Sequence, residues 1–462
     1  MTYTDDVVSY IQMRGTSTES GRRPVLHAIV DTLAVAAAAS STSLVRTVRS
    51  TLVATGPQVL WGTRQTGSPI ESAFHNGVAA HALDFDDMSE SVRGHLSSVL
   101  LPALFAALLA LPEEDSNAAA TRFSRAYAVA AQVAGSLAAG LTLDGHYRRG
   151  FHSTTTVGAI AATAGVAHLL ALTPNITRNA LGIAASTASG IRQNFGSDTK
   201  ALQVGSSAAN AIRAIQFAAR GLTADADSLG GQAGFLRVFG EPAELENAVS
   251  ILNGQAVVDH PGINIKLIPS CYELQRTAHA ALQLRDNLPE SIDSIQVTLN
   301  RRATDPLIMR YPTNGREAQF SPSFVVAAAF ELGQLNLSAF TDEVVFDARI
   351  SDIASRVVVG EADAPSEGGA PLSRFAAITV AGGGAIVQAV VEEAPGSALL
   401  ELDRSALRRK ALDCLTVLGR SDLTGRLFSA AQSLIYGGET APIRDFIIEL
   451  GRPANHGVVR PQ

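Results

Sequence analysis

The segment from Asp144 to His152 concentrates acid, base and cation in a chain in which only 17% of residues are charged. Its nine residues, Asp-Gly-His-Tyr-Arg-Arg-Gly-Phe-His, contain two imidazoles, a phenol, two guanidiniums and a carboxylate. Imidazoles and phenols can transfer protons, and guanidiniums bind carboxylates through paired hydrogen bonds. We therefore expect a site in this segment.

A buried helix is expected directly after it. Residues 153–172 are apolar or small, and Ser153 or Thr154 is a suitable N-cap. His152 would then lie at the helix N-terminus, where the positive potential favours a bound anion and disfavours a protonated imidazole.

Lys200 ends a Gly-rich, polar turn that begins at Ser189, and a helix of small residues follows from Ala201. At the start of that helix it would point into the cavity that the loops enclose. Desolvation lowers the pKa of a lysine, which can then act as a base. An exposed lysine that merely ends the loop is the alternative.

Three aspartates occur within residues 84–87, near the end of a helix that begins at about Phe74. Carboxylates at a helix C-terminus oppose the helix dipole, so a compensating group is required. His95 and Arg93 are the candidates. A metal is not expected, because no second carboxylate cluster with matching spacing accompanies the first.

Composition limits the class of protein. A chain of 462 residues predicts two domains. The net charge of -7 argues against nucleic acid or an anionic membrane as the main partner. Cys271 and Cys414 lie far apart, which predicts neither a disulfide framework nor a zinc site. The acidic N-terminus shows no export signal, and the apolar run 25–39 is too short to span a bilayer, so we expect a cytoplasmic protein.

Hydrophobic periodicity predicts a mostly α-helical protein with a smaller α+β part. Helical spacing dominates up to residue 265 and returns after residue 398. Between them we expect helices over 275–288 and 322–332, the second capped by Ser321, and strands over 291–300, 356–359, 375–380 and 386–391, separated by Gly- and Pro-rich turns. The predicted domains are therefore a helical domain, 1–265 with 399–462, and an α+β domain, 266–398.

Six short motifs occur in an order that resembles the MmgE/PrpD superfamily. This superfamily contains 2-methylcitrate dehydratase, cis-aconitate decarboxylase and iminodisuccinate epimerase. The matching motifs are His75-Asn-Gly with His81-Ala-Leu-Asp-Phe-Asp-Asp87, the downstream His95, Gly150-Phe-His152, Phe195-Gly-Ser-Asp-Thr-Lys200, Lys266-Leu-Ile-Pro-Ser-Cys271 and Glu317-Ala-Gln-Phe-Ser321.

The resemblance implies a large all-helical domain built from both chain ends, a smaller α+β lid and an active site in the cleft between them. It also implies a homodimer and catalysis without an obligatory organic cofactor. The family's functional positions correspond here to Asp84, His95, His152, Lys200 and Tyr311.

The chain departs from the family at two places. Gln275 stands where lyases of the family commonly have a histidine, and Met88 stands where Thr is frequent. A glutamine neither gives nor takes a proton at neutral pH. An epimerase needs only one base and one acid on opposite faces of a carbon, so it is easier to build from the remaining groups.

The chemistry that the resemblance implies is proton movement next to a carboxylate of a small di- or tricarboxylate. Cations must hold the carboxylates, and Gln275 and Tyr311 are further candidate contacts. The candidate clamps, each of which could instead be a surface charge, are Arg148, Arg149, Arg192 and Lys266.

We therefore expect an epimerase of the iminodisuccinate type in which Lys200 and either Tyr147 or His152 form an opposed acid and base pair. Tyr147 could alternatively be a half-buried phenol that only packs. A dehydratase of 2-methylcitrate or a decarboxylase of cis-aconitate is the alternative enzyme. A non-catalytic dimer that binds carboxylates is an alternative of another class.

Overall fold

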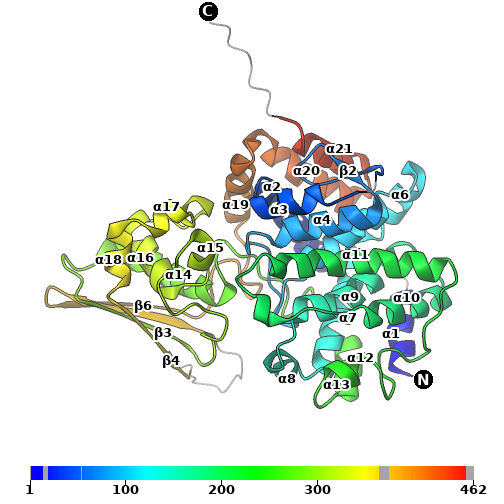
Figure 1. Cartoon of the computed structure of the whole chain (residues 1–462), viewed down its shortest axis with the longest axis horizontal. Coiled ribbons are helices and arrows are strands. Elements are labelled where there is room, and N and C mark those ends of the chain that lie inside the picture. Colours follow the sequence, from blue (N-terminus) through cyan, green and yellow to red (C-terminus); the bar gives the residue numbers. More distant parts are fainter. Residues whose placement is uncertain (1, 14–18, 54, 364–373, 454–462) are drawn as a thin grey trace, which may run out of the picture. The chain divides into compact units, whose positions relative to one another are not determined.

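The computed structural model describes residues 2–13, 19–53, 55–363 and 374–453, which form two compact bodies (Figure 1). The helical body comprises Met1–Ala82, Asp86–Asn264 and Leu407–Gln462, and the smaller body comprises Leu83–Phe85 and Ile265–Ala406. Residues 83–85, 265 and 399–406 thus group with the smaller body, whereas the sequence assigned them to the helical domain. The tail 454–462 of that predicted domain lies outside the described residues.

The chain is mostly helical, as the sequence predicts. A salt bridge between buried Asp31 and Lys410 ties the C-terminal segment to α2 within the helical body. The elements of this body are α1 (Tyr3–Gln12), α2 (Glu19–Ala39), α3 (Ser43–Ser50), β1 (Gln58–Val59), β2 (Thr66–Gly67), α4 (Pro69–His81), α5 (Ser97–Leu108), α6 (Glu113–Ala120), α7 (Phe123–Gly140), α8 (Leu143–Arg148), α9 (Ser153–Leu169), α10 (Pro174–Ser186), α11 (Thr199–Ala219), α12 (Phe235–Phe239), α13 (Leu245–Leu252), α19 (Arg404–Val417), α20 (Thr424–Gln432) and α21 (Ala441–Leu450).

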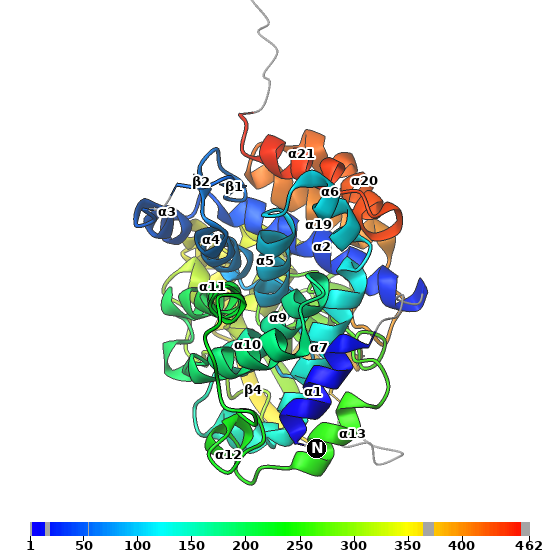
Figure 2. The ribbon, with the colours of Figure 1, turned by 90° about the vertical axis from the view of Figure 1, so that its right-hand side faces the viewer.

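Two helices, α5 and α9, form the centre of the helical body. Every residue of both is buried, and Figure 2 shows them between α4 and α11 on one side and α7 on the other. Their Ala, Ser, Thr and Gly residues allow neighbouring helices to approach from all sides. The buried helix expected after His152 is confirmed, but its N-cap is His152 itself, one residue before the predicted Ser153.

Glycines set the crossing of α4 and α11, which run side by side (Figure 1). A Cβ added to Gly205 would lie 2.4 Å from the carbonyl oxygen of Phe74, and one added to Gly77 would lie 2.9 Å from the Cα of Gly205. No larger residue fits either position without a shift of the backbone. The crossing lies four residues before the end of α4 and near the start of α11.

The smaller body contains a four-stranded sheet with helices on one face (Figure 1). The strand order is β4-β3-β5-β6, in which β3 is parallel to β4 and the other pairs are antiparallel. The elements are α14 (Gln275–Leu284), β3 (Ser294–Asn300), α15 (Gly315–Ala318), α16 (Pro322–Leu332), α17 (Asp342–Val345), α18 (Ala348–Ala354), β4 (Val357–Ala362), β5 (Ala376–Gly382) and β6 (Ala385–Val391).

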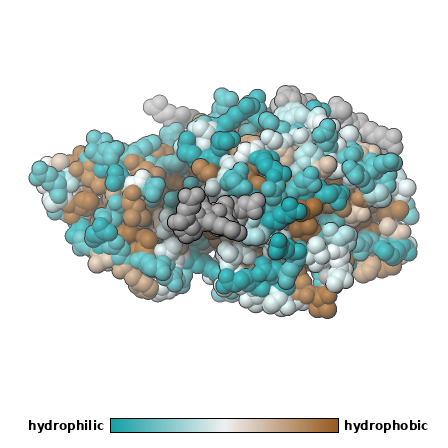
Figure 3. Space-filling view, turned by 90° about the horizontal axis from the view of Figure 1, so that it is seen from above, coloured by the Kyte–Doolittle hydropathy of each residue, from teal (hydrophilic) through white to brown (hydrophobic). Residues whose placement is uncertain are grey.

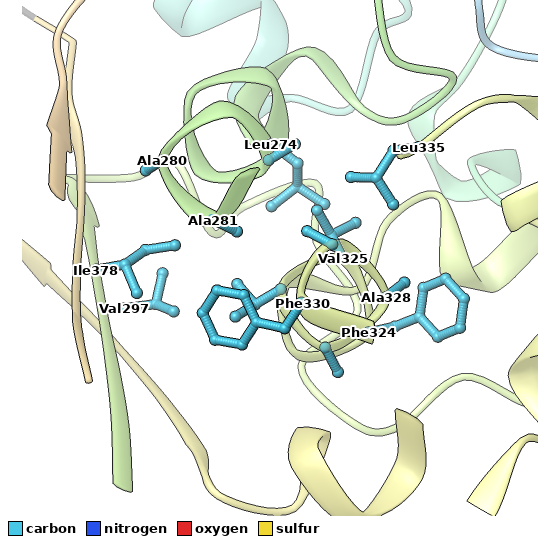
Figure 4. Close-up of a cluster of buried hydrophobic side chains, with 14 of the residues drawn as sticks. Leu274, Ala280, Ala281, Val297, Phe324, Val325, Ala328, Phe330, Leu335 and Ile378 are labelled. Atoms are coloured by element: carbon cyan, nitrogen blue, oxygen red, sulfur yellow. The ribbon is translucent and has the colours of Figure 1, made fainter. Parts of the chain in front are cut away.

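Alternation along the strands builds the core of this body. Val297 and Ile378 point from the sheet toward Phe330 of α16 and Ala281 of α14 (Figure 4). Burial of one such large apolar side chain stabilises the body by about 1.5–3 kcal/mol. The predicted cap is confirmed, because the Ser321 hydroxyl accepts a hydrogen bond from the third residue of α16. The Gly- and Pro-rich turn expected before β5 falls on residues 364–373, outside the described residues.

Polar side chains cover most of the face of the molecule seen in Figure 3, and hydrophobic residues occur there in small groups. Within the described ranges no single helix is long and apolar enough to cross a membrane. The two helices Gly21–Ala39 and Ser43–Ser50 together have the length and composition of a membrane span, but the chain bends by 85° between them.

Candidate active site

His81 and Asp86 form a buried hydrogen-bonded pair at the end of α4. The Nδ1 atom of His81 lies 2.8 Å and 3.0 Å from the two carboxylate oxygens. Burial lowers the pKa of His81 to about 4, against the raising effect of Asp86. Burial alone would raise the pKa of Asp86, but the hydrogen bond that it accepts from His81 helps to hold this pKa well below its usual value. A neutral imidazole therefore donates from Nδ1 to an ionised carboxylate.

His95 joins this pair from the loop before α5. Its ring centroid lies 4.5 Å from that of His81, and its Nδ1 lies 3.4 Å from Asp86. The backbone N–H of His95 donates to Thr154 Oγ1 at 3.1 Å, which fixes the loop to α9. A Cβ on Gly94 would lie 2.5 Å from the same hydroxyl oxygen, so the approach requires a glycine there.

His152 lies at the start of α9, with its ring centroid 6.4 Å from that of His81. Its Nδ1 lies 2.7 Å from the Gln203 amide oxygen. Burial lowers the pKa of His152 well below its usual value, and the positive charge of Lys200 lowers it further. Among the residues that the structure describes, the buried Nε2 atoms of His81 and His152 have no hydrogen-bond partner. His81, Asp86, His95 and His152 are called the imidazole cluster below.

Lys200 is the second residue of α11 and only 8% exposed. Its ammonium lies 5.2 Å from the ring centroid of Phe195, and its charge lowers the pKa of both His81 and His152. The predicted burial of Lys200 at a helix start is confirmed. The site therefore combines neutral imidazoles with one desolvated cation.

The three aspartates after α4 take three different sets of partners. Asp86 belongs to the imidazole cluster. Asp87 accepts hydrogen bonds from the Ser97 hydroxyl and, at 3.2 Å, from the Ser97 backbone, and burial raises its pKa to about 7. Asp84, whose φ is +48°, groups with the smaller body. Of the two expected partners, His95 lies beside one of the acids, Asp86, and Arg93 pairs with Asp144 instead.

In the smaller body Lys266 is fully buried. Its ammonium donates to the backbone carbonyl of Asp84 and lies 3.4 Å from the side-chain carboxylate of Asp84. The Gln275 side chain donates to the Ile268 carbonyl at 2.8 Å and to the Ser270 hydroxyl at 3.1 Å. It also accepts from the Ile268 N–H at 3.3 Å. We call Gln275, Ile268 and Ser270 the amide cluster. These bonds hold a turn of the body's own chain.

Tyr311, the other candidate in this body, donates its hydroxyl to the Val345 carbonyl at 2.8 Å and is half-buried. This contact is thus also internal to the body. Binding of substrate by Tyr311 stays a prediction.

Tyr147, Arg149 and Arg192 contact other residues of the helical body. The Arg192 guanidinium lies 3.3 Å from the ring centroid of Tyr147 and donates to the Tyr147 carbonyl at 2.9 Å. Arg149 is exposed, donates to the Phe239 carbonyl and pairs with Glu241 at 3.5 Å. Arg148 is exposed as well. The proposed proton transfer by Tyr147 and substrate binding by these arginines stay predictions.

His81, Asp86 and Gln203 were not predicted as site residues. A histidine and an aspartate five positions apart at a helix end were a usable signal, because the turn after the helix can bring them together. Gln203 follows Lys200 by three residues, so the two share one face of α11.

A metal ion is one possible occupant of the imidazole cluster by donor type. His81, Asp86 and His95 offer atoms within 4.8 Å of one another. The Nδ1 atom of His81 is already engaged with Asp86, however, and the nearby charge of Lys200 opposes a second cation. We therefore interpret these residues as acid and base groups.

Comparison with known proteins gives matches along most of the chain. Residues 13–248 match the model of the MmgE/PrpD N-terminal domain, and residues 268–427 match that of the MmgE/PrpD C-terminal domain. Cis-aconitate decarboxylase of Homo sapiens is 27% identical over 297 residues, 63% of this chain and 61% of the human protein.

Two further relatives carry the same name. Cis-aconitate decarboxylase of Mus musculus is 27% identical over 296 residues, 63% of this chain and 60% of the mouse protein. That of Aspergillus terreus is 25% identical over 333 residues, 68% of either chain. The matches thus span about three fifths of the length of the mammalian relatives.

Proposed function

The chain belongs to the MmgE/PrpD family, and on this premise we propose that it is a lyase that acts on a small di- or tricarboxylate. Decarboxylation of a cis-aconitate-like acid is the leading reaction, because the relatives reported above are named for it. The expected iminodisuccinate epimerase finds no support among them. The alternative enzyme named from the sequence is therefore better supported than the first expectation.

One observation carries the proposal. Lys200 is buried at the start of α11, the ring centroids of His81 and His152 lie 6.4 Å apart, and the charge of Lys200 lowers the pKa of both imidazoles. Buried groups with strongly shifted pKa values are typical of sites for proton transfer. The positive charge also suits a substrate that carries carboxylates.

The argument from Gln275 against a lyase loses weight. Its amide is already engaged with Ile268 and Ser270 inside the smaller body. A residue that supports a turn says little about how many proton-transfer groups the reaction needs. The absence of a histidine at this position therefore does not favour an epimerase.

In the proposed decarboxylation the bond between a carbon and its carboxylate breaks, and carbon dioxide leaves. The electron pair stays on the substrate, delocalised over the neighbouring double bond and a second carboxylate. Lys200 then gives its proton to the far carbon of this system and regains one from water. The neutral Nε2 atoms of His81 and His152 accept hydrogen bonds or a proton, the role required if the same site instead dehydrates a hydroxy acid.

Proton NMR in heavy water tests the proposal. Purified protein with EDTA is incubated separately with cis-aconitate, 2-methylcitrate and one stereoisomer of iminodisuccinate. Loss of carbon dioxide with one deuterium incorporated supports the decarboxylase, and loss of water supports the dehydratase. Deuterium at the α-carbon with inversion and an unchanged formula would support the epimerase and overturn the proposal, as would binding without any reaction. Sedimentation of the same protein tests the proposed homodimer.

A further inference from the structure

The Gln203 side chain connects His152 to the loop before the short helix Arg192–Asn194. Its Nε2 donates to the Ile191 carbonyl at 3.1 Å, and its Oε1 lies 2.7 Å from His152 Nδ1. A carbonyl only accepts hydrogen bonds, so the NH2 group of the amide must be the end that faces Ile191. The amide oxygen therefore faces His152, and His152 Nδ1 must carry the hydrogen.

We propose that Gln203 is a positioning residue that holds His152 in the Nδ1–H tautomer, so that the Nε2 lone pair is available to accept a hydrogen bond or a proton from the substrate. The inference rests on the proposed function, because that function gives His152 Nε2 the role of an acceptor. Gln203 itself acts only through the imidazole.

The loop that orients Gln203 is itself firmly held. Its backbone makes three hydrogen bonds with the start of α9 and the residues before it: His152 N–H to the Gly190 carbonyl at 3.1 Å, Arg192 N–H to the Gly150 carbonyl at 2.8 Å, and Thr155 Oγ1 to the Ser189 carbonyl at 2.6 Å. The Ile191 carbonyl therefore has a fixed position, and the orientation of the amide follows from it.

Gly190 permits this arrangement. Its φ is +127°, and a Cβ there would lie 2.0 Å from Thr155 Oγ1 and 3.1 Å from Gln203 Oε1. A side chain at this position would push the loop away from both residues. The close contact of loop, Gln203 and His152 thus depends on a glycine.

A neutral amide suits His152 better than a carboxylate would. The titratable groups that affect His152 are Lys200 on α11, His81 on α4 and His95 in the loop before α5, and each of them disfavours its protonation. Gln203 fixes the tautomer without adding a negative charge, so the imidazole stays neutral beside the ammonium. His81 has the same tautomer, but there the carboxylate of Asp86 accepts the hydrogen.

Histidine-selective 15N NMR tests the tautomer directly and needs no substrate. The full-length protein is compared with Gln203→Leu, Gln203→Glu and Gln216→Leu, the last a matched control on the same helix, and His152→Gln assigns the signal. We expect a neutral Nδ1–H imidazole at pH 7 in the wild type and the control. We expect a mixture of tautomers in Gln203→Leu and an imidazolium in Gln203→Glu.

Steady-state kinetics then tests the consequence. In Gln203→Leu kcat should fall about 100-fold, within the range of general-base contributions, with KM nearly unchanged. In Gln203→Glu the acid limb of kcat/KM should move to higher pH, because the base must first lose a proton. An Nε2–H tautomer or an imidazolium in the wild type, or full kcat in a Gln203→Leu protein whose tautomer has changed, overturns the inference. The expected tautomers without turnover of any tested acid would instead overturn the proposed function alone.

Discussion

The imidazole cluster of the helical body, in which all residues except His95 are buried, and the buried amide cluster of the smaller body differ in how their polar atoms are satisfied. In the amide cluster the Gln275 side chain both donates and accepts, and every bond ends on its own turn. In the imidazole cluster, considering only the described part of the chain, His81 Nε2 and His152 Nε2 lack partners although both are buried.

This difference indicates that the amide cluster supports the fold and that the imidazole cluster takes part in the reaction. An unsatisfied buried polar group costs about 1–3 kcal/mol of stability. Two such groups close together indicate that the residues are retained for a function and not for stability. A satisfied cluster gives no such indication. We therefore expect substitutions in the imidazole cluster to affect turnover and substitutions in the amide cluster to affect folding.

The largest effect should come from Lys200→Met, which removes the ammonium and keeps a stem of similar size beside Phe195. We expect kcat to fall about 1,000-fold, because proton transfer by a positioned side chain contributes 10²- to 10⁴-fold, while the melting temperature stays nearly constant. Lys410→Met is the control, since it removes the cation of a buried salt bridge with Asp31 and should cost about 3–5 kcal/mol of stability. A Lys200→Met protein that unfolds as readily as the control would remove the distinction between the clusters.

Gln275→Leu should have the opposite signature. The change leaves the Ile268 N–H and the Ser270 hydroxyl without the Gln275 amide, whereas the Ile268 carbonyl keeps the Ser270 N–H as a donor at 2.8 Å. We expect a loss of about 3 kcal/mol in the free energy of unfolding. Urea unfolding followed by circular dichroism measures it. Gln296→Leu, the same change on the exposed side of β3, should alter stability by less than about 0.5 kcal/mol. Equal effects of the two variants would show that the amide cluster does not support the fold.

Asp87 sharpens the comparison, because it is a satisfied acid directly beside Asp86. Burial raises its pKa from 3.8 to about 7, so between these values the folded protein holds a proton that the unfolded chain has released. Its contribution to stability is therefore present at low pH and is lost as pH rises toward 7. Asp87→Asn should remove about 2 kcal/mol of this dependence between pH 5 and 7 without lowering kcat.

The buried histidines act in the opposite direction. The pKa values of His75 and His81 are lowered to about 4 by burial, so the unfolded chain binds more protons between pH 4 and 6.5, and stability rises with pH there. Urea titrations of the wild type and Asp87→Asn at pH 5, 6 and 7 isolate the aspartate, since both proteins share these histidines. Parallel curves would mean that Asp87 is ionised throughout.

The smallest effect is expected for Tyr311→Phe. Loss of the hydroxyl removes one hydrogen bond, to Val345, and should cost about 1 kcal/mol of stability. If the hydroxyl has only this internal role, KM stays the same. A tenfold higher KM with unchanged stability would instead identify Tyr311 as a substrate contact and extend the chemistry to the smaller body.

Local patterns were sufficient for the helix after His152 and for the cap of α16, although the N-cap of α9 is His152 and not the predicted Ser153 or Thr154. The uninterrupted small and apolar run after His152 predicts a helix buried on all sides, and Ser321 followed by Pro322 predicts a cap. The helix and the cap each depend on residues within one or two helical turns along the chain, so the local sequence is enough to predict them. The position of Lys200 between a polar turn and an apolar helix allowed either a buried or an exposed lysine, and the structure shows it buried.

Pairings between distant segments were beyond such patterns. Arg93 and His95 were equally good partners for the acids after α4, and only the folded chain gives Arg93 to Asp144 and His95 to Asp86. Gln203 and Gln275 carry no charge, so a search for titratable groups overlooks the first and misinterprets the second. Their roles arise from carbonyls that the fold brings to them.

The close approach of α4 and α11 at Gly77 and Gly205 fixes a distance within the site. His81 follows Gly77 on α4, while Lys200 and Gln203 precede Gly205 on α11, so the bare backbones at the crossing set the gap between proton acceptor and cation. One methyl group at either glycine would push the two helices apart and widen this gap. An alanine at either position would therefore move His81 away from Lys200 and Gln203, so the two glycines together limit the size of the acid that the site can hold.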